Sequence, residues 1–190
     1  EYFVEKELIQ QDETKTIYTA TKFGLITNQL YIPPRDAVKI REDLEYAAVL
    51  DSKEEISLND VSFLHLLSSL ASFPKPYMRT KDAAIVIPFV DDQTDHYIVE
   101  EVPEPGAYLF DEFAQENKLV MILSQWIDEA PDKEIVENFD IGAGDLHRFV
   151  ENAQWLMRAV VQIDRLKVTS KFSQLLEILY LRIVHGVRPQ

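Results

Sequence analysis

The feature that most constrains the fold of this chain is one long amphipathic segment, Asp145 to Leu166. Its apolar residues recur at the spacing of an α-helix and form a single stripe centred near Leu146, Ala153 and Val160. A stripe of this kind is normally buried against other elements of the same protein. We therefore predict a long helix here, with its apolar side facing the core.

The side of this helix opposite the stripe carries a distinctive set of residues. Arg148, Trp155 and Gln162 follow one another at seven-residue intervals, and Asn152 and Arg158 flank them. An indole ring stacks on any nucleobase, which contributes roughly 1–3 kcal/mol per base. A guanidinium pairs with phosphate, and amides hydrogen-bond to the nucleic-acid backbone or to base edges. The combination favours single-stranded nucleic acid, because duplex bases are not open for stacking.

Two interpretations of this outer face stay open from the residues alone. A second layer of helices could cover Trp155, since a tryptophan in an amphipathic helix usually packs. An exposed Trp155 would instead indicate binding. Trp126 is a contrasting case, for which we predict packing among its apolar neighbours Leu119, Ile122, Leu123 and Ile127.

The rest of the chain also has a mainly helical pattern. Short β-compatible runs at residues 7–10 and 16–20 predict a hairpin, followed by a helix from Lys22 to Leu30 that Thr21 caps. Further helices are predicted over residues 35–48, 61–71, 108–129, 133–138, 145–166 and 170–185. We expect irregular structure or a broken helix over residues 80–106, where prolines interrupt the pattern.

Several predicted helix ends carry recognisable signals. Ser57 with Asp60 resembles a capping box, and the helix after it is apolar almost all round, which predicts deep burial. Ser170 is the predicted N-cap of the last helix, and Gly186 is its predicted stop. The predicted fold class is mainly α: a partial winged helix with a small β-hairpin, followed by a multi-helix bundle.

The net charge of −14, from 19 basic and 33 acidic residues, restricts how the chain can meet nucleic acid. Neutralisation of phosphates supplies most non-specific affinity, so this sign opposes free-standing binding. Contact with DNA is therefore expected to be local, or to depend on basic partners elsewhere in a larger molecule. The same charge supports an alternative function, an acidic helical domain that docks a basic protein without direct DNA contact.

Sequence patterns for catalysis and for cofactor binding are missing. The chain has no cysteine, only 5 glycines and no phosphate-binding loop, and its 4 histidines lack zinc-ligand spacing. We predict no catalytic, cofactor-binding or metal site here, so this chain alone should not hydrolyse ATP. It starts without methionine inside an apparent helix, which suggests a piece of a longer protein. No apolar run of about 18 residues exists, so we expect a cytoplasmic protein that does not cross a membrane.

Several short motifs along the chain together resemble the patterns of one known protein family. Residues 141–146 and 150–156 resemble the family patterns I-G-x-G-D-(I/L) and V-E-x-A-x-W-L. Residues 126–129 resemble W-I-x-E, and residues 21–24 with 30–32 resemble T-K-x-G and L-Y-I. Residues 182–187 resemble R-(I/V)-x-x-G-V. The order and spacing of these matches, spread from Thr21 to Val187, make the resemblance specific. The family that they resemble is the archaeal Hjm-type helicases, which are Ski-like superfamily-two DNA helicases.

The resemblance implies an architecture and a DNA-binding role. Such a helicase has two RecA-like motor domains that bind ATP and Mg²⁺, a winged helix, a helical ratchet domain and a small C-terminal helical domain. Residues 1–33 would be the end of the winged helix, and residues 34–190 the ratchet domain. The long helix would lie across single-stranded DNA at a fork, with Trp155 stacked on a base and Arg148 on the strand. The motors would then move DNA past it in the 3′ to 5′ direction.

Overall fold

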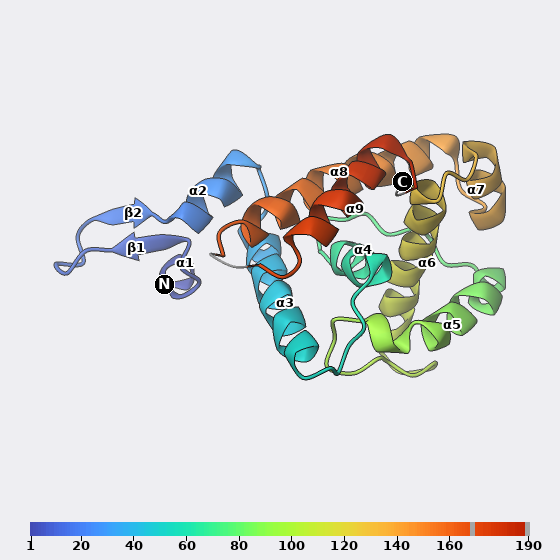
Figure 1. Ribbon diagram of the computed structural model, residues 1–190, viewed down its shortest axis with the longest axis horizontal. Helices are drawn as coiled ribbons and strands as arrows, with labels where there is room; N and C mark the ends of the chain where they lie inside the picture. The colour runs from blue at the N-terminus through green and yellow to red at the C-terminus, as the bar shows by residue number, and fades with distance from the viewer. Residues whose placement is uncertain (168–169, 189–190) are drawn as a thin grey trace.

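The computed structural model describes residues 1–167 and 170–188 and confirms a mainly α-helical chain. Its elements are α1 (Tyr2–Glu5), β1 (Ile9–Gln11), β2 (Tyr18–Ala20), α2 (Lys22–Gln29), α3 (Pro34–Ser52), α4 (Asp60–Ser68), η1 (Thr80–Asp82), α5 (Ala83–Asp92), η2 (Thr94–His96), α6 (Phe110–Ile127), α7 (Asp132–Phe139), α8 (Ala143–Asp164) and α9 (Ser173–His185). The two strands pair antiparallel in the register Ile9↔Ala20, Gln10↔Thr19 and Gln11↔Tyr18. Figure 1 shows the hairpin projecting from one end of a helical bundle. No described helix is long and apolar enough to cross a membrane.

The hairpin docks on α2 through a very close backbone approach at Gly24. Thr21 caps α2 as predicted, because its Oγ1 accepts a hydrogen bond from the Gly24 amide at 3.0 Å. The Thr21 amide in turn donates to the Leu8 carbonyl at 3.1 Å. A Cβ atom on residue 24 would overlap that same carbonyl oxygen. Glycine is therefore required where the hairpin lies against the first turn of α2.

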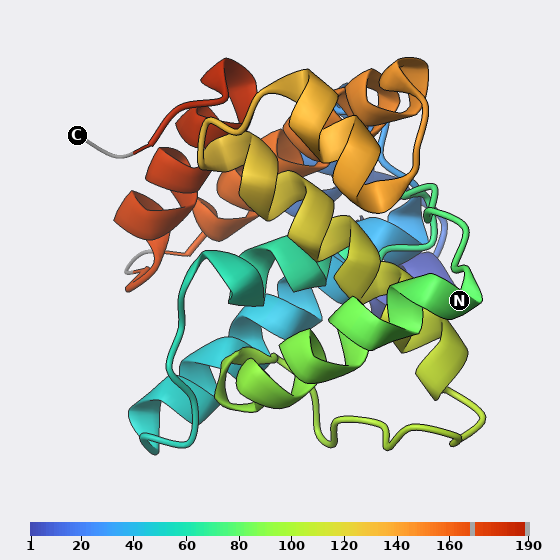
Figure 2. The same cartoon turned by 90° about the vertical axis from the view of Figure 1, so that its right-hand side faces the viewer.

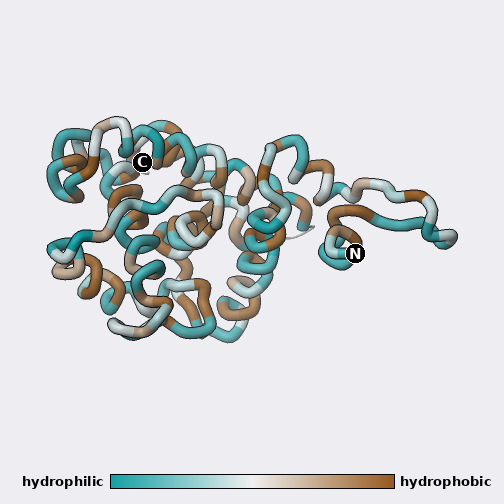
Figure 3. Tube along the Cα trace, turned by 180° about the vertical axis from the view of Figure 1, so that it is seen from behind, coloured by the Kyte–Doolittle hydropathy of each residue, from teal (hydrophilic) through white to brown (hydrophobic). Residues whose placement is uncertain are grey.

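The long helix α8 is the centre of the bundle. It packs against α2, α3, α4, α6, α7 and α9, and its predicted apolar stripe is buried from Leu146 to Val161. From the side, α6 crosses the front of the bundle, with α5 below it and α7 above it (Figure 2). Hydrophobic and hydrophilic stretches alternate along the trace, as amphipathic helices require (Figure 3). The prediction of a long helix facing the core is confirmed.

A buried arginine fastens the last helix to the bundle. Arg182 on α9 forms ion pairs with Asp60 of α4 and with Asp128, which follows α6. Its Nη2 also donates to the Ile127 carbonyl at 3.4 Å. A buried guanidinium is stable only when it is paired and hydrogen-bonded in this way. Arg182 therefore has a structural role that joins three segments distant in the sequence.

Two of the predicted caps were wrong, and the predicted stop of α9 is confirmed. α4 is capped by Asn59, whose Oδ1 accepts from the Ser62 amide while Ser62 Oγ accepts from the Asn59 amide. Ser57 instead donates its amide to Asp95. Ser170 does not cap α9, because the helix begins only at Ser173 with Phe172 as its N-cap. The Ser170 hydroxyl instead accepts from the Phe172 amide at 3.1 Å and donates to the buried carboxylate of Asp164 at 2.6 Å. A buried carboxylate requires donors, and the Ser173 hydroxyl supplies a second one to Asp164 at 2.8 Å. Gly186, at φ +59°, ends α9 as predicted.

Residues 80–106 were predicted to be irregular or to form a broken helix. The structure has one continuous helix there, α5, and only two short 3-10 turns and loop over the rest of the region. α5 runs through Pro88, which is exposed, as is Ala84, whose carbonyl loses its helical partner. Before it, the buried Asp82 carboxylate accepts from Lys118 Nζ at 2.7 Å. Burial acts to raise the pKa of Asp82, but the hydrogen bonds from Lys118 and the Arg79 amide hold that pKa below its ordinary value. This buried pair anchors the start of α5 on α6.

Candidate nucleic-acid interface

All five predicted site residues lie on α8, and the structure divides them into two groups. Arg148 and Asn152 form local contacts near the start of the helix. Arg148 Nη2 donates to the Asp145 carboxylate at 3.0 Å, and Asn152 Nδ2 donates to the Arg148 carbonyl at 2.8 Å. The side chain of Arg148 is exposed. Arg148 and Asn152 therefore remain on the outer surface of the helix, and neither residue lines the grooves described next.

Trp155 is half-buried, because the end of α2 covers part of the helix surface around it. The indole Nε1 donates to the carbonyl oxygen of Leu30 at 2.8 Å. Leu30 is the C-cap residue of α2, so its carbonyl is not used by the helix itself. The bond fixes the orientation of the ring. Trp155 thus joins α2 to α8 and still reaches the surface.

The surface beside Trp155 is a groove of about 520 Å³ between α2, α8 and α9. We call it the Trp155 groove. It is lined by Gln29, Leu30 and Tyr31 from the end of α2, by Glu151, Gln154, Trp155 and Arg158 from α8, and by Tyr180 from α9. The lining therefore contains three aromatic side chains, one guanidinium group and two side-chain amides. This is a composition that suits an unstacked base with its phosphate.

A second, smaller groove of about 240 Å³ continues along the same pair of helices. Its lining includes Gln162 of α8, Arg165 directly after α8, Glu177 of α9, and again Arg158 and Tyr180. Because Arg158 and Tyr180 line both grooves, the two form one track along α8 and α9. The structure therefore brings three of the predicted residues together on this track, namely Trp155, Arg158 and Gln162.

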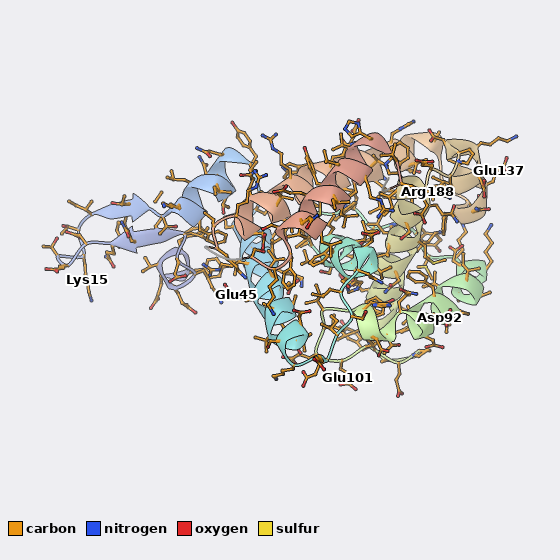
Figure 4. All side chains as sticks on the ribbon, viewed as in Figure 1. Lys15, Glu45, Asp92, Glu101, Glu137 and Arg188 are labelled. Carbon is orange, nitrogen blue, oxygen red and sulfur yellow. The ribbon has the colours of Figure 1, made fainter. Side chains whose placement is uncertain are left out.

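Arg158 is the cation on this track that has no acidic partner. Within the described residues no carboxylate lies within 4 Å of its guanidinium, whereas Arg165 pairs with Glu177 at 3.0 Å. Many acidic side chains lie elsewhere, and Figure 4 labels Glu45, Asp92, Glu101 and Glu137 along the outside of the bundle. An unpaired guanidinium in a chain of net charge −14 is available for an anion.

Comparison with known proteins gives the chain a family. Residues 61–186 match the family described as archaeal helicase, domain 4. The chain belongs to this family. The resemblance to archaeal DNA helicases that the motifs indicated is thereby confirmed. The matched region includes all of α8 and the residues of α9 that line the two grooves. Leu30 and Tyr31 lie before it in the sequence.

Individual relatives extend the similarity over the whole chain. It is 30% identical to the ATP-dependent DNA helicase Hel308 of Pyrococcus horikoshii, over 100% of this chain and 25% of that protein. It is 28% identical to the Hel308 of Thermococcus kodakarensis, over 100% of this chain and 16% of that protein. The Hel308 of Methanocella arvoryzae is 26% identical, over 87% of this chain and 22% of that protein. The chain thus spans a quarter or less of the length of these relatives.

The structure also assigns groove residues that sequence reasoning missed, above all Tyr31. This tyrosine follows Leu30, the C-cap residue of α2, and has φ +54°, a left-handed conformation that favours glycine. The Tyr31 amide donates to Asn28 at 3.1 Å and the Ile32 amide donates to Thr27 at 3.1 Å, which together form a Schellman motif. The sequence did contain a signal for Tyr31, because it has an aromatic residue at the position after a helix where glycine is preferred.

Trp126 packs as predicted and contrasts with Trp155. It lies against the core, with its indole Nε1 donating to the Ile183 carbonyl at 2.9 Å. A Cβ atom on Gly186 would come within 3.0 Å of its ring. Both indole N–H groups of the chain therefore donate a hydrogen bond to a backbone carbonyl of a segment that is distant in the sequence. Only the Trp155 ring also lines one of the two grooves described above.

Proposed function

We propose that this chain is the DNA-binding and translocation module of an ATP-dependent 3′ to 5′ DNA helicase, in which α8 holds single-stranded or forked DNA. Trp155 stacks on a base, and Arg148 and Arg158 bind phosphates. Asn152 and Gln162 donate hydrogen bonds to the strand. RecA-like motor domains of the same longer chain bind ATP with Mg²⁺ and supply the force. The protein works in the cytoplasm, where a cell without a nucleus keeps its DNA.

The observation that carries this proposal is the meeting of a fixed indole ring with an unpaired guanidinium in the Trp155 groove. The bond from Trp155 to Leu30 holds the ring before DNA arrives, so little ordering is required on binding. Arg158 lines the same groove and has no carboxylate of its own among the described residues. The groove therefore places a ring that can stack on a base beside a guanidinium group that can bind its phosphate.

The position of α8 explains how such a grip transmits movement. The helix packs against six other helices, so the track moves as one body with the bundle. A motor that shifts the bundle would then shift a strand held by Trp155 and Arg158. Stacking is insensitive to base identity, which suits a protein that must pass over every sequence.

The negative charge of the chain favours a second candidate, an acidic domain that docks a basic protein. Two guanidinium groups, one on α8 and one directly after it, are already paired with the chain's own carboxylates, Arg148 with Asp145 and Arg165 with Glu177. In this case Trp155 would serve only to join α2 to α8. The two candidates differ in whether DNA reaches the Trp155 ring.

Tryptophan fluorescence distinguishes these candidates, because the chain has only 2 tryptophans. In a Trp126→Phe variant the emission comes from Trp155 alone. Titration with oligothymidylate at low salt should then quench this emission in a saturable way, since base stacking quenches indole. A Trp155→Phe variant, which keeps Trp126, is the matched control and should show no quenching. Far-UV circular dichroism checks that both variants are folded.

Opposite results would favour the second candidate. Absence of quenching together with absence of oligothymidylate binding would overturn the DNA-binding proposal. Salt-sensitive binding of polylysine by the same preparation would then support the acidic docking domain.

A further inference from the structure

A second aromatic side chain, Tyr31, lines the Trp155 groove from a different element. We propose that Tyr31 is a second stacking platform, so that the groove holds one unstacked base between Tyr31 and Trp155 while Arg158 binds its phosphate. This inference rests on the proposed function, that α8 binds single-stranded nucleic acid. It extends the binding site from α8 to the end of α2.

The exposure of Tyr31 is the first observation in its favour. Its side chain is 87% exposed although it borders a groove that contains Trp155 and Tyr180. No aromatic pair joins these three rings to one another within residues 1–167 and 170–188. The space between them therefore belongs to the groove and is open to a planar ligand. A nucleobase is a planar ligand that aromatic side chains hold by stacking.

The backbone of Tyr31 is the second observation. The residue occupies the left-handed position of a Schellman motif, where glycine is the favoured residue and a bulky side chain is strained. Its ring makes little packing contact that would offset this strain. Strained residues of this kind are concentrated at binding and active sites. The side chain is thus better explained by a ligand than by the stability of the fold.

The connection between Tyr31 and Trp155 is the third observation. The Trp155 indole bonds the carbonyl of Leu30, the residue directly before Tyr31. The two Schellman hydrogen bonds, from Tyr31 to Asn28 and from Ile32 to Thr27, fix the backbone on either side. Both stacking groups are therefore positioned before a base enters, which lowers the ordering cost of binding.

The polar groups of the groove agree with a base and its phosphate. Arg158 is the cation of the groove, and among the described residues no carboxylate pairs with it. Gln154 and Gln29 can donate to or accept from base edges. Glu151 would repel a phosphate but can accept from base amino groups. The base edge is therefore expected toward Glu151 and Gln154, and the phosphate toward Arg158.

The test compares two ligands of equal length, fluorescein-labelled oligothymidylate and an abasic deoxyribose-phosphate oligomer. Tyr31→Ala should weaken binding of oligothymidylate by at least about fivefold, because one stacking contact is lost. Its affinity for the abasic oligomer should equal that of the wild type. Tyr31→Phe, which keeps the ring, should restore oligothymidylate binding. The matched control is Tyr108→Ala, because Tyr108 is 96% exposed and lies outside the groove.

The possible failures are distinguishable. If Tyr31→Ala binds oligothymidylate as the wild type does, or weakens both ligands equally, the stacking role of Tyr31 is wrong while the proposed function stands. If the wild-type chain binds neither oligomer, and Trp155 emission is unquenched, the proposed function itself fails and this inference fails with it.

Discussion

At the scale of single residues, Tyr31 has a strained backbone conformation that lowers the stability of the fold, while its ring stays exposed. A left-handed backbone costs a residue with a Cβ atom about 1–2 kcal/mol, whereas glycine adds about 0.5–1 kcal/mol of unfolded-chain entropy. Tyr31→Gly should therefore raise the free energy of unfolding by roughly 0.5–1 kcal/mol, the difference between these effects. Urea denaturation of the wild type and the variant measures it.

The control for this prediction is Tyr31→Ala, which removes the ring but keeps the Cβ atom. Because the ring is 87% exposed, its loss alone should change the unfolding midpoint very little. A Tyr31→Gly variant that is less stable than the wild type would contradict the prediction. It would show that the ring stabilises the fold.

Residue-scale patterns predicted the face on which Trp155 lies but not what covers it. A helical wheel contains only neighbours along one helix, whereas Leu30 is 125 positions away in the sequence. The half-buried state of Trp155 results from this long-range contact, which made the choice between packing and binding undecidable from periodicity. The same limit hid Tyr180, which reaches the groove from α9.

At the scale of elements, the docking of the hairpin on α2 depends on Gly24. A Cβ atom there would overlap the Leu8 carbonyl, so Gly24→Ala should separate the hairpin from α2 while the bundle stays folded. Hydrogen exchange is the measurement. The Thr21 amide, bonded to Leu8, should lose protection, whereas amides of α8 should keep theirs.

Gly144 provides a matched control for this substitution. It lies in the first turn of α8, and a Cβ atom there would have nothing within 4 Å. Gly144→Ala should therefore leave the hairpin docked and stabilise the chain by about 0.5–1 kcal/mol, the helix preference of alanine over glycine. Unchanged Thr21 protection in Gly24→Ala would show that the hairpin can move aside at no cost.

The sequence predicted the ends of helices correctly where local signals determine them. It failed where buried contacts with other elements determine them. Thr21 and Gly186 act as predicted, because capping and left-handed stops are local. Ser170 was misassigned because α9 begins only at Ser173, while Ser170 lies in the preceding segment and bonds the buried Asp164 carboxylate, a tertiary feature. A helix here was expected only as a broken one, and its continuity through Pro88 was missed for a related reason, since the neighbouring Asp82–Lys118 pair anchors it to another element.

At the scale of the whole molecule, the fold class and the family could be predicted from the sequence, but the local charge along α8 could not. The net charge of −14 reflects mainly the outside of the bundle, where carboxylates such as Glu45 and Glu137 lie. Which cations remain unpaired depends on side-chain geometry. Arg158 emerged as the available cation only after Arg148 and Arg165 were seen to pair with Asp145 and Glu177.

This contrast between net and local charge predicts an unusually weak salt dependence of DNA binding. For single strands, the logarithm of affinity falls with the logarithm of salt with a slope of about −0.7 per neutralised phosphate. The proposed function gives two phosphate contacts, one from Arg148 and one from Arg158, so the slope should be about −1.4. Salt also screens repulsion between the strand and the acidic bundle, which acts to flatten the slope further. Fluorescence anisotropy of labelled oligothymidylate across a salt series measures this slope.

Substitution of single cations locates the source of the slope. Arg158→Gln should make it less negative by about 0.7, the contribution of one phosphate contact. Lys15→Gln is the control, because Lys15 is an exposed cation at the hairpin turn, far from the track (Figure 4), and its loss should leave the slope unchanged. A slope steeper than about −4 would require more cations than this track holds. Strand contact would then have to spread over Lys and Arg residues beyond α8, and the local grip at Trp155 would be wrong.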